Sequence, residues 1–303
     1  MTLAPRAVLV YRHTELDELL ARHGTRGQAA FYLRSRGRRI KDLEARHKEQ
    51  TAAKGEVSSG IPADWRRGMV ERADLPRFLF GPDDIVVAVG QDGLVANLAK
   101  YLDGQLIIGI NPEPLRNPGV LVRHPPGACT ELLALAARGG GGSPGANARV
   151  ERLTMVTAET DDGQRLSGLN EVYLGQPTHQ TARYTLRLPD GRTEAQASSG
   201  LIVSTGTGAT GWCRSAWLER RSSLVLPSPE EERLAWFVRE AWPSPTSGTA
   251  FTEGTLPAGQ EIEVTAESDR LVLFGDGVES DAIPLTWGQT ARIRLADRCL
   301  RLL

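Results

Sequence analysis

Short apolar runs alternate with amphipathic segments in the first half of the chain. Ala7–Tyr11, Ile85–Val89 and Leu106–Asn111 are rich in aliphatic residues and have the length of buried strands. Leu94–Leu102 separates the last two runs and has a helical pattern of apolar positions. A strand, a helix and a second strand in this spacing predict a βαβ unit with a parallel sheet.

The remaining segments of this half are predicted to be helical. Thr14 is a suitable N-cap for an amphipathic helix over residues 14–20. Residues 27–54 are rich in Arg, Lys and Glu and predict a helix with a solvated charged face, with a basic binding arm as the alternative. Residues 131–138 predict one more helix. Residues 139–145, mostly glycine followed by Ser-Pro-Gly, are typical of a linker, so we place a domain boundary at residue 145.

After this boundary the apolar period shortens to that of strands. Turn dipeptides such as Asp162-Gly163, Asp190-Gly191 and Asp276-Gly277 separate the segments. The predicted strands are 150–158, 170–174, 182–188, 200–204, 261–265, 271–274 and 291–295, with a helical insertion at Pro229–Glu240. The predicted fold class is therefore α/β plus all-β. It consists of a parallel-sheet domain over residues 1–145 and an antiparallel β domain over residues 146–286.

Composition narrows the function classes. The 303 residues contain 36 Lys and Arg against 37 Asp and Glu, so overall charge favours neither nucleic acid nor an anionic membrane as a partner. The 3 cysteines form no CxxC pair and the 5 histidines show no ligand spacing, so neither a disulfide framework nor a zinc site is indicated. No apolar run approaches the roughly 18 residues of a membrane span, and no basic leader is present. We expect a cytoplasmic protein.

The first candidate for chemistry follows the strand that ends at Val89. The turn Gly90-Gln91-Asp92-Gly93 places one carboxylate between two glycines. Glycine lets the backbone approach a phosphate closely, and a carboxylate held there can orient or deprotonate a hydroxyl group. The turn therefore suggests phosphoryl transfer to a hydroxyl, with a purely structural turn, the commoner use of such a sequence, as the alternative.

The second candidate is the segment Ser204–Trp212, which follows the apolar run Leu201-Ile202-Val203. Alternating glycines and hydroxyl residues expose backbone N–H groups and add hydroxyl donors, which suit phosphate, ribose or adenine. The segment lacks the Gly-Lys-Ser/Thr ending of a P-loop. Asn170 and Glu171, at a predicted strand start, can bind a ribose diol by paired hydrogen bonds or simply face water.

Taken together and in this order, these motifs resemble those of the NAD kinase family. The family's Gly-Gly-Asp-Gly, Asn-Glu, Ser-Thr-Pro-Thr-Gly-Ser-Thr-Ala-Tyr and Asp-Gly motifs are similar to residues 90–93, 170–171, 204–212 and 276–277. Ser198–Leu201, Gly109–Pro114, Phe237–Glu240 and Leu300–Leu303 look most like the mitochondrial-type branch and its bacterial relatives.

The resemblance implies a two-domain kinase that transfers the γ-phosphoryl group of ATP, with Mg²⁺, to the adenosine-ribose 2′-hydroxyl of NAD(H). Asp92 would be the catalytic residue, and a C-terminal tail of about residues 287–303 would pack back on the first domain. A homo-oligomer, at least a dimer, is implied, and no metal ligands are identified. The nucleotide- and phosphate-binding residues would be Gly90, Gln91, Gly93, Thr205, Thr207, Gly208 and Thr210. The substrate-binding residues would be Asn170, Glu171, Ser199, Trp212, Ser215 and Asp276.

Three positions depart from the family pattern. Gln91 replaces a glycine, Leu94 replaces a threonine whose hydroxyl would face the phosphates, and Ser199 stands where many bacterial members carry an aspartate. Two alternatives therefore stay open. One is a kinase of the same fold that acts on another small alcohol or sugar, and the other is a non-catalytic dinucleotide-binding protein.

Overall fold

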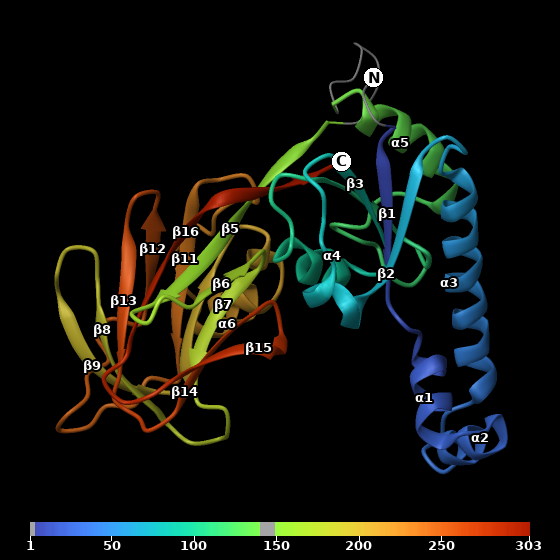
Figure 1. Ribbon diagram of the computed structural model, residues 1–303. Coiled ribbons are helices and arrows are strands. Elements are labelled where there is room, and N and C mark those ends of the chain that lie inside the picture. Colours follow the sequence, from blue (N-terminus) through green and yellow to red (C-terminus); the bar gives the residue numbers. More distant parts are fainter. Residues whose placement is uncertain (1–3, 140–148) are drawn as a thin grey trace. The chain divides into compact units, whose positions relative to one another are not determined.

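A computed structural model describes residues 4–139 and 149–303 and divides the chain into two compact units (Figure 1). Unit 1 comprises residues 1–151 together with 301–303, and unit 2 comprises residues 152–300. Apart from Gly139, the predicted linker at residues 139–145 lies outside the described residues. Of the predicted tail at about 287–303, only the last three residues are part of unit 1.

Unit 1 is an α/β unit built on parallel strands. Its sheet has the order β2-β1-β3-β4, and Arg301 and Leu302 add a further parallel segment beside β4. In chain order its elements are β1 (Arg6–Tyr11), α1 (Glu15–His23), α2 (Arg26–Arg34), α3 (Ile40–Gly60), β2 (Arg66–Glu71), η1 (Arg72–Arg77), β3 (Asp84–Val89), α4 (Asp92–Ala99), β4 (Leu106–Ile110), η2 (Pro126–Ala128) and α5 (Cys129–Ala137).

Both faces of this sheet are covered, which explains why its central strands are apolar throughout. Every residue of β3 and β4 is buried. On one face, alternate residues such as Val87 and Ile108 share a core with Val57 of α3 and Leu133 of α5. Helix α4 contacts β3 and β4 and is itself almost wholly buried. Loops at the carboxyl ends of such strands are the usual place for a ligand site.

The predicted helix over residues 27–54 is wrong as a single element. The structure forms α2 and α3 instead, separated by a turn in which Gly37 adopts a φ of 69°. Helices α1, α2 and the start of α3 pack around a small apolar core of their own that includes Leu16, Leu33 and Leu43. Figure 1 shows α1 and α2 gathered at one end of the long helix α3. The predicted cap is confirmed, because Thr14 forms a capping box at the start of α1.

Unit 2 is an antiparallel β sandwich with one helix. One sheet has the order β12-β11-β10-β7-β14-β15, and the other places β13 between β16 and β8, with β9, β5 and β6 beyond. Residues from both sheets, such as Val203 and Val264, belong to one buried core. Its elements are β5 (Glu151–Thr160), β6 (Arg165–Gly168), β7 (Glu171–Gly175), β8 (Ala182–Arg187), β9 (Thr193–Ser198), β10 (Gly200–Ser204), η3 (Gly208–Thr210), α6 (Trp212–Arg220), β11 (Arg233–Arg239), β12 (Glu253–Pro257), β13 (Glu261–Ala266), β14 (Leu271–Gly275), β15 (Val278–Leu285) and β16 (Thr290–Leu302).

The predicted helical insertion at Pro229–Glu240 is also wrong. Residues 233–239 form β11, which pairs with β10 and β12 inside the sheet. Leu234, Trp236 and Val238 face the sandwich core, whereas Ala235 and Phe237 pack against α6. The helix of this unit is therefore α6, directly after the glycine-rich segment. None of the helices in the described ranges is both long and apolar enough to span a membrane.

Candidate functional site

The turn Gly90–Gly93 lies where β3 ends and α4 begins. Gln91 is the N-cap residue of α4 and Asp92 is its first residue. Gly90 is half-buried, and an added Cβ there would lie 3.0 Å from Leu94. Gly93 is exposed, and no atom lies within 4 Å of the position of a Cβ. The turn thus presents backbone to solvent at the carboxyl edge of the parallel sheet, at a helix N-terminus that favours negative charge.

The carboxylate of Asp92 is bound by the loop that follows β4. Its Oδ1 accepts hydrogen bonds from the backbone N–H groups of Leu121 at 2.7 Å and Val122 at 3.0 Å, and its Oδ2 accepts one from Val120 at 2.9 Å. This loop runs close against β4, because a Cβ on Gly109 would lie 2.0 Å from the carbonyl oxygen of Leu121. Asp92 is therefore held in place by main-chain donors.

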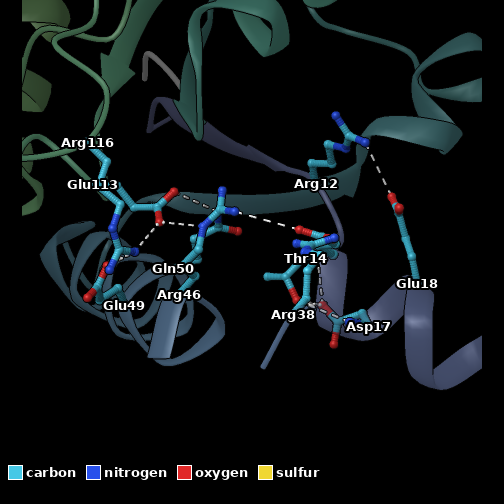
Figure 2. Close-up of polar contacts among 11 residues, drawn as sticks. Arg12, Thr14, Asp17, Glu18, Arg38, Arg46, Glu49, Gln50, Glu113 and Arg116 are labelled. Atoms are coloured by element: carbon cyan, nitrogen blue, oxygen red, sulfur yellow. Dashed lines mark hydrogen bonds and ion pairs between the residues drawn. The ribbon is translucent and has the colours of Figure 1, made fainter. Parts of the chain in front are cut away.

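A cavity of about 350 Å³ adjoins the turn in unit 1. Three arginines contribute to its wall: Arg12 after β1, Arg46 on α3 and Arg72 in η1. Arg72 donates to Asn97 at 2.8 Å. Figure 2 shows the ion pair of Arg12 with Glu18, whose atoms lie 3.4 Å apart. The other lining residues are His13, Thr14, Glu15, Glu18, Gln50, Val89, Gly90, Gln91, Gly93, Leu94 and Asn97.

Sequence reasoning missed these arginines. They come from three separate segments, and no spacing in the sequence joins them. Arg46 lies within the stretch that we interpreted as a solvated charged face, so its inward position has no local signature. The position of Arg12 directly after the end of β1 is the one usable signal, because residues at the carboxyl ends of parallel strands collect at one edge.

In unit 2, Thr205 organises the glycine-rich segment from within. Its hydroxyl donates to the carbonyl of Leu169 at 2.5 Å and accepts from the N–H groups of Thr207 at 3.1 Å and Gly208 at 3.3 Å. The residue is fully buried. Thr205 therefore shapes the segment, and its hydroxyl is already occupied. Gly206 is required at its position, because a Cβ there would lie 1.9 Å from the carbonyl oxygen of Ser228.

Thr207 differs from Thr205 in the hydrogen bonding of its hydroxyl. Its side chain is 4% exposed, and its Oγ1 has no hydrogen-bond partner among the described residues. Its carbonyl accepts from the Thr210 hydroxyl at 2.9 Å. A buried hydroxyl without a partner costs free energy, so such a group in a native fold is a candidate contact for a bound molecule.

Asp276 ties the predicted Asn-Glu pair into this arrangement. Its carboxylate accepts from the N–H groups of Leu169 at 2.8 Å, Asn170 at 2.7 Å and Glu171 at 3.3 Å. The carbonyl of Asn170 in turn accepts from the Thr205 N–H at 2.9 Å. Residues 169–171, 205–208 and 276 are thus brought together by hydrogen bonds.

Aromatic side chains continue this surface. Trp212 stacks on Tyr173 at a centroid distance of 5.2 Å, and the Arg239 guanidinium lies 5.2 Å from the Trp212 ring. Burial raises the pKa of Tyr173, whose hydroxyl donates to the Ser199 carbonyl at 2.5 Å. Trp212 and Ser215 both line a cavity of about 220 Å³.

The predicted residues therefore form one group in each unit. Unit 1 contains Asp92 and the rest of its turn, and unit 2 contains the remainder. The described part of the chain has no cluster of three or more His, Cys, Asp or Glu side chains that could hold a metal ion.

The chain was compared with protein families, with curated proteins and with solved structures. No protein-family profile matches the chain. A solved structure, an NAD kinase from Archaeoglobus fulgidus in complex with ATP, is similar with a TM-score of 0.56 and 19% identity, covering 98% of this chain and 92% of that one. The chain therefore has the fold of the NAD kinases, which confirms the predicted fold class of an α/β domain plus an all-β domain.

The sequence comparison leads to the same group. The chain is 26% identical over 148 residues, 48% of its length, to an NAD kinase from Chlorobaculum tepidum. This match covers 47% of that protein, so the chain spans about half the length of the curated relative. The resemblance to the NAD kinase family is confirmed by both comparisons, and the mitochondrial-type branch stays a prediction.

Proposed function

We propose that the chain is an NAD kinase that transfers the γ-phosphoryl group of ATP to the adenosine-ribose 2′-hydroxyl of NAD(H). The observation that carries the proposal is the cavity beside the turn Gly90–Gly93, with Arg12, Arg46 and Arg72 in its wall. Arginine is suited to phosphate because its planar guanidinium offers several donors in a fixed geometry. A triphosphate would find these cations and exposed backbone at a helix N-terminus together.

The proposed chemistry assigns a separate task to each unit. In unit 1, Asp92 would accept the proton of the 2′-hydroxyl of the substrate. The 2′-oxygen would attack the γ-phosphorus of ATP, and the bond from the γ-phosphorus to the oxygen that bridges it to the β-phosphate would break, which releases ADP. Asp92 Oδ2 accepts one backbone N–H hydrogen bond and Oδ1 accepts three, so Oδ2 keeps room for the substrate hydroxyl. Mg²⁺ would be held mainly by phosphate oxygens and water and would neutralise the developing charge.

In unit 2, NAD(H) would bind the surface around residues 169–171 and 205–212. The Thr207 hydroxyl, which has no hydrogen-bond partner within residues 4–139 and 149–303, would donate to a substrate oxygen. Trp212, already stacked on Tyr173, would offer a flat apolar face. Asn170 and Glu171, fixed by Asp276, would contact a ribose. We also propose that the protein is cytoplasmic and forms a homo-oligomer. Sedimentation of the purified protein would test the oligomeric state.

A direct assay tests the activity. Purified protein is incubated with Mg-ATP and NAD, and NADP is followed with an NADP-specific dehydrogenase. NADP formation supports the proposal. If NAD binds but no NADP is formed, the result would favour a non-catalytic dinucleotide-binding protein. If NAD does not bind, the result would favour a kinase that acts on another alcohol. Arg12→Gln should raise the KM for ATP, whereas the exposed Arg77→Gln serves as a charge-matched control.

A further inference from the structure

A buried carboxylate in the segment Gly109–Pro114 connects the cavity to the loop that binds Asp92. Glu113 follows β4, and its side chain is 0% exposed. It accepts hydrogen bonds from Arg46 Nε at 3.0 Å, Arg116 Nη1 at 3.1 Å and Gln50 Nε2 at 3.3 Å (Figure 2). Burial alone would raise the pKa of Glu113, but the bonds from Arg46 and Gln50 hold it below its usual value. The residue is therefore a compensated buried anion.

On one side, Glu113 fixes two residues of the cavity wall. Arg46 and Gln50 lie four residues apart on α3, and both line the cavity beside Gly90–Gly93. Glu113 accepts from the Nε of Arg46, and Nη1 of the same guanidinium lies 3.7 Å from a carboxylate oxygen of Glu15. Because a guanidinium has five N–H donors, this arrangement orients Arg46 and still leaves donors for a ligand.

On the other side, Glu113 organises the loop after β4 through its main chain. Its N–H donates to Asn111 Oδ1 at 3.0 Å, and its carbonyl accepts from the N–H groups of Arg116 and Asn117, each at 3.0 Å. Asn111 Nδ2 closes the turn by donating to the Asn117 carbonyl at 2.7 Å. The chain then turns at Gly119, with a φ of 71°, and the next three N–H groups bind Asp92.

We propose that Glu113 is a positioning residue that sets both Arg46 in the cavity wall and the loop that holds the Asp92 carboxylate. The kinetic part of this inference rests on the proposed function, whereas the structural part does not. Removing the charge of Glu113 would leave Arg46 without its anchor and would release the start of the loop from α3. The consequence would appear at Asp92, although the hydrogen bonds of Glu113 go to other residues of α3 and of the loop.

The test uses Glu113→Gln in the full chain, with Glu49→Gln as the matched control. Glu49 also pairs with Arg116, at 3.3 Å, but its side chain is 46% exposed. Hydrogen exchange of the amides of residues 120–122, followed by mass spectrometry, should be about tenfold faster in Glu113→Gln and unchanged in the control. Calorimetry with Mg-ATP alone should show weaker binding by about tenfold in Glu113→Gln only.

Kinetics then separate positioning from general destabilisation. Glu113→Gln should lower kcat and raise the KM for ATP more than the KM for NAD, whereas a smaller folded fraction would leave both KM values unchanged. If Glu113→Gln fails to fold, Glu113→Asp, which keeps the charge, replaces it, with smaller shifts in the same directions. Unchanged exchange at residues 120–122 with unchanged ATP binding would overturn the inference. Faster exchange in a protein whose wild type makes no NADP would leave the inference standing and overturn the proposed function instead.

Discussion

Leu121 donates its backbone N–H to the carboxylate of Asp92 at 2.7 Å, so the proposed catalytic residue is held by the main chain of another loop. Val120 and Val122 donate to the same carboxylate. Backbone N–H donors stabilise a carboxylate anion without placing a positively charged side chain beside it, and they fix the position of both of its oxygens. The carboxylate is thus pre-positioned before any substrate arrives.

Replacing Asp92 by Asn tests this assignment. The amide keeps an acceptor oxygen for Leu121 but cannot take a proton, so turnover should fall by about 10²-fold or more. Initial rates of NADP formation measure the effect. Asp74→Asn, at an exposed carboxylate paired with Arg77, is the control and should retain full activity. Normal turnover in Asp92→Asn would remove Asp92 from the role of base.

Thr207 and Thr205 provide a contrasting pair of hydroxyl groups. Thr207→Val removes a buried hydroxyl without a described partner, so stability should hold or rise while the KM for NAD increases. Thr205→Val removes a hydroxyl that bonds to Leu169, Thr207 and Gly208, and should cost about 1–3 kcal/mol of stability. Urea unfolding and NAD titration measure the two effects. A Thr207→Val variant that is destabilised and binds NAD normally would contradict the ligand role.

Gly93 should tolerate a methyl group in the free protein. No atom lies within 4 Å of its Cβ position, and the residue lies in the first turn of α4, so Gly93→Ala should be more stable by up to about 1 kcal/mol. If a phosphate approaches this backbone closely, ATP binding should weaken in the same variant. Gly206→Ala is the comparison, because its Cβ would meet the Ser228 carbonyl and destabilise the fold by roughly 1–3 kcal/mol. Unchanged ATP affinity in Gly93→Ala would argue against close contact at this glycine.

The cysteines predict a pH dependence of stability. Burial raises the pKa of the Cys129 thiol to about 11, and that of Cys213 likewise to about 11. Because these values exceed the roughly 8.5 of an unfolded thiol, the stability that they reflect is complete below pH 8.5 and is lost as the pH rises toward 11. Denaturant midpoints between pH 8 and pH 11 should therefore fall. Iodoacetamide at pH 8 should label the half-buried Cys299 before the other two, and early labelling of Cys213 would contradict its burial.

The strands beside the first motif could be predicted because the signal for each lies within its own segment. β3 and β4 are continuous apolar runs ended by glycine or asparagine, and such runs are typical of strands buried on both faces of a parallel sheet. The error at β11 has an equally local cause. Acidic residues such as Glu230, Glu231 and Glu232 are typical of the first turn of a helix, whereas the apolar residues that follow are buried on both faces of a central strand.

The site was less accessible from the sequence than the fold. The sequence places Asp92 at the turn after β3, but the partners of its carboxylate are N–H groups of residues 120–122, and backbone donors have no side-chain signature. Glu113 has the same character, because its three donors come from α3 and from its own loop. Such contacts depend on tertiary packing between segments that are distant in the sequence, so no local sequence pattern predicts them.

Strand β16 has a consequence for the order in which the protein can fold. Its first residues pair with β13 in unit 2, whereas Arg301 and Leu302 pair with β4 of unit 1, and the Leu303 carbonyl lies 3.0 Å from His124 Nε2. A ribosome makes all of unit 2 before it makes these residues, which at typical elongation rates takes roughly ten seconds or more. During that interval the edge of β4 at Leu106 and Ile107 lacks the partner that Arg301 and Leu302 provide. The nascent chain is therefore open to strand addition or chaperone binding at this edge until residues 301–303 have been made and pair with it.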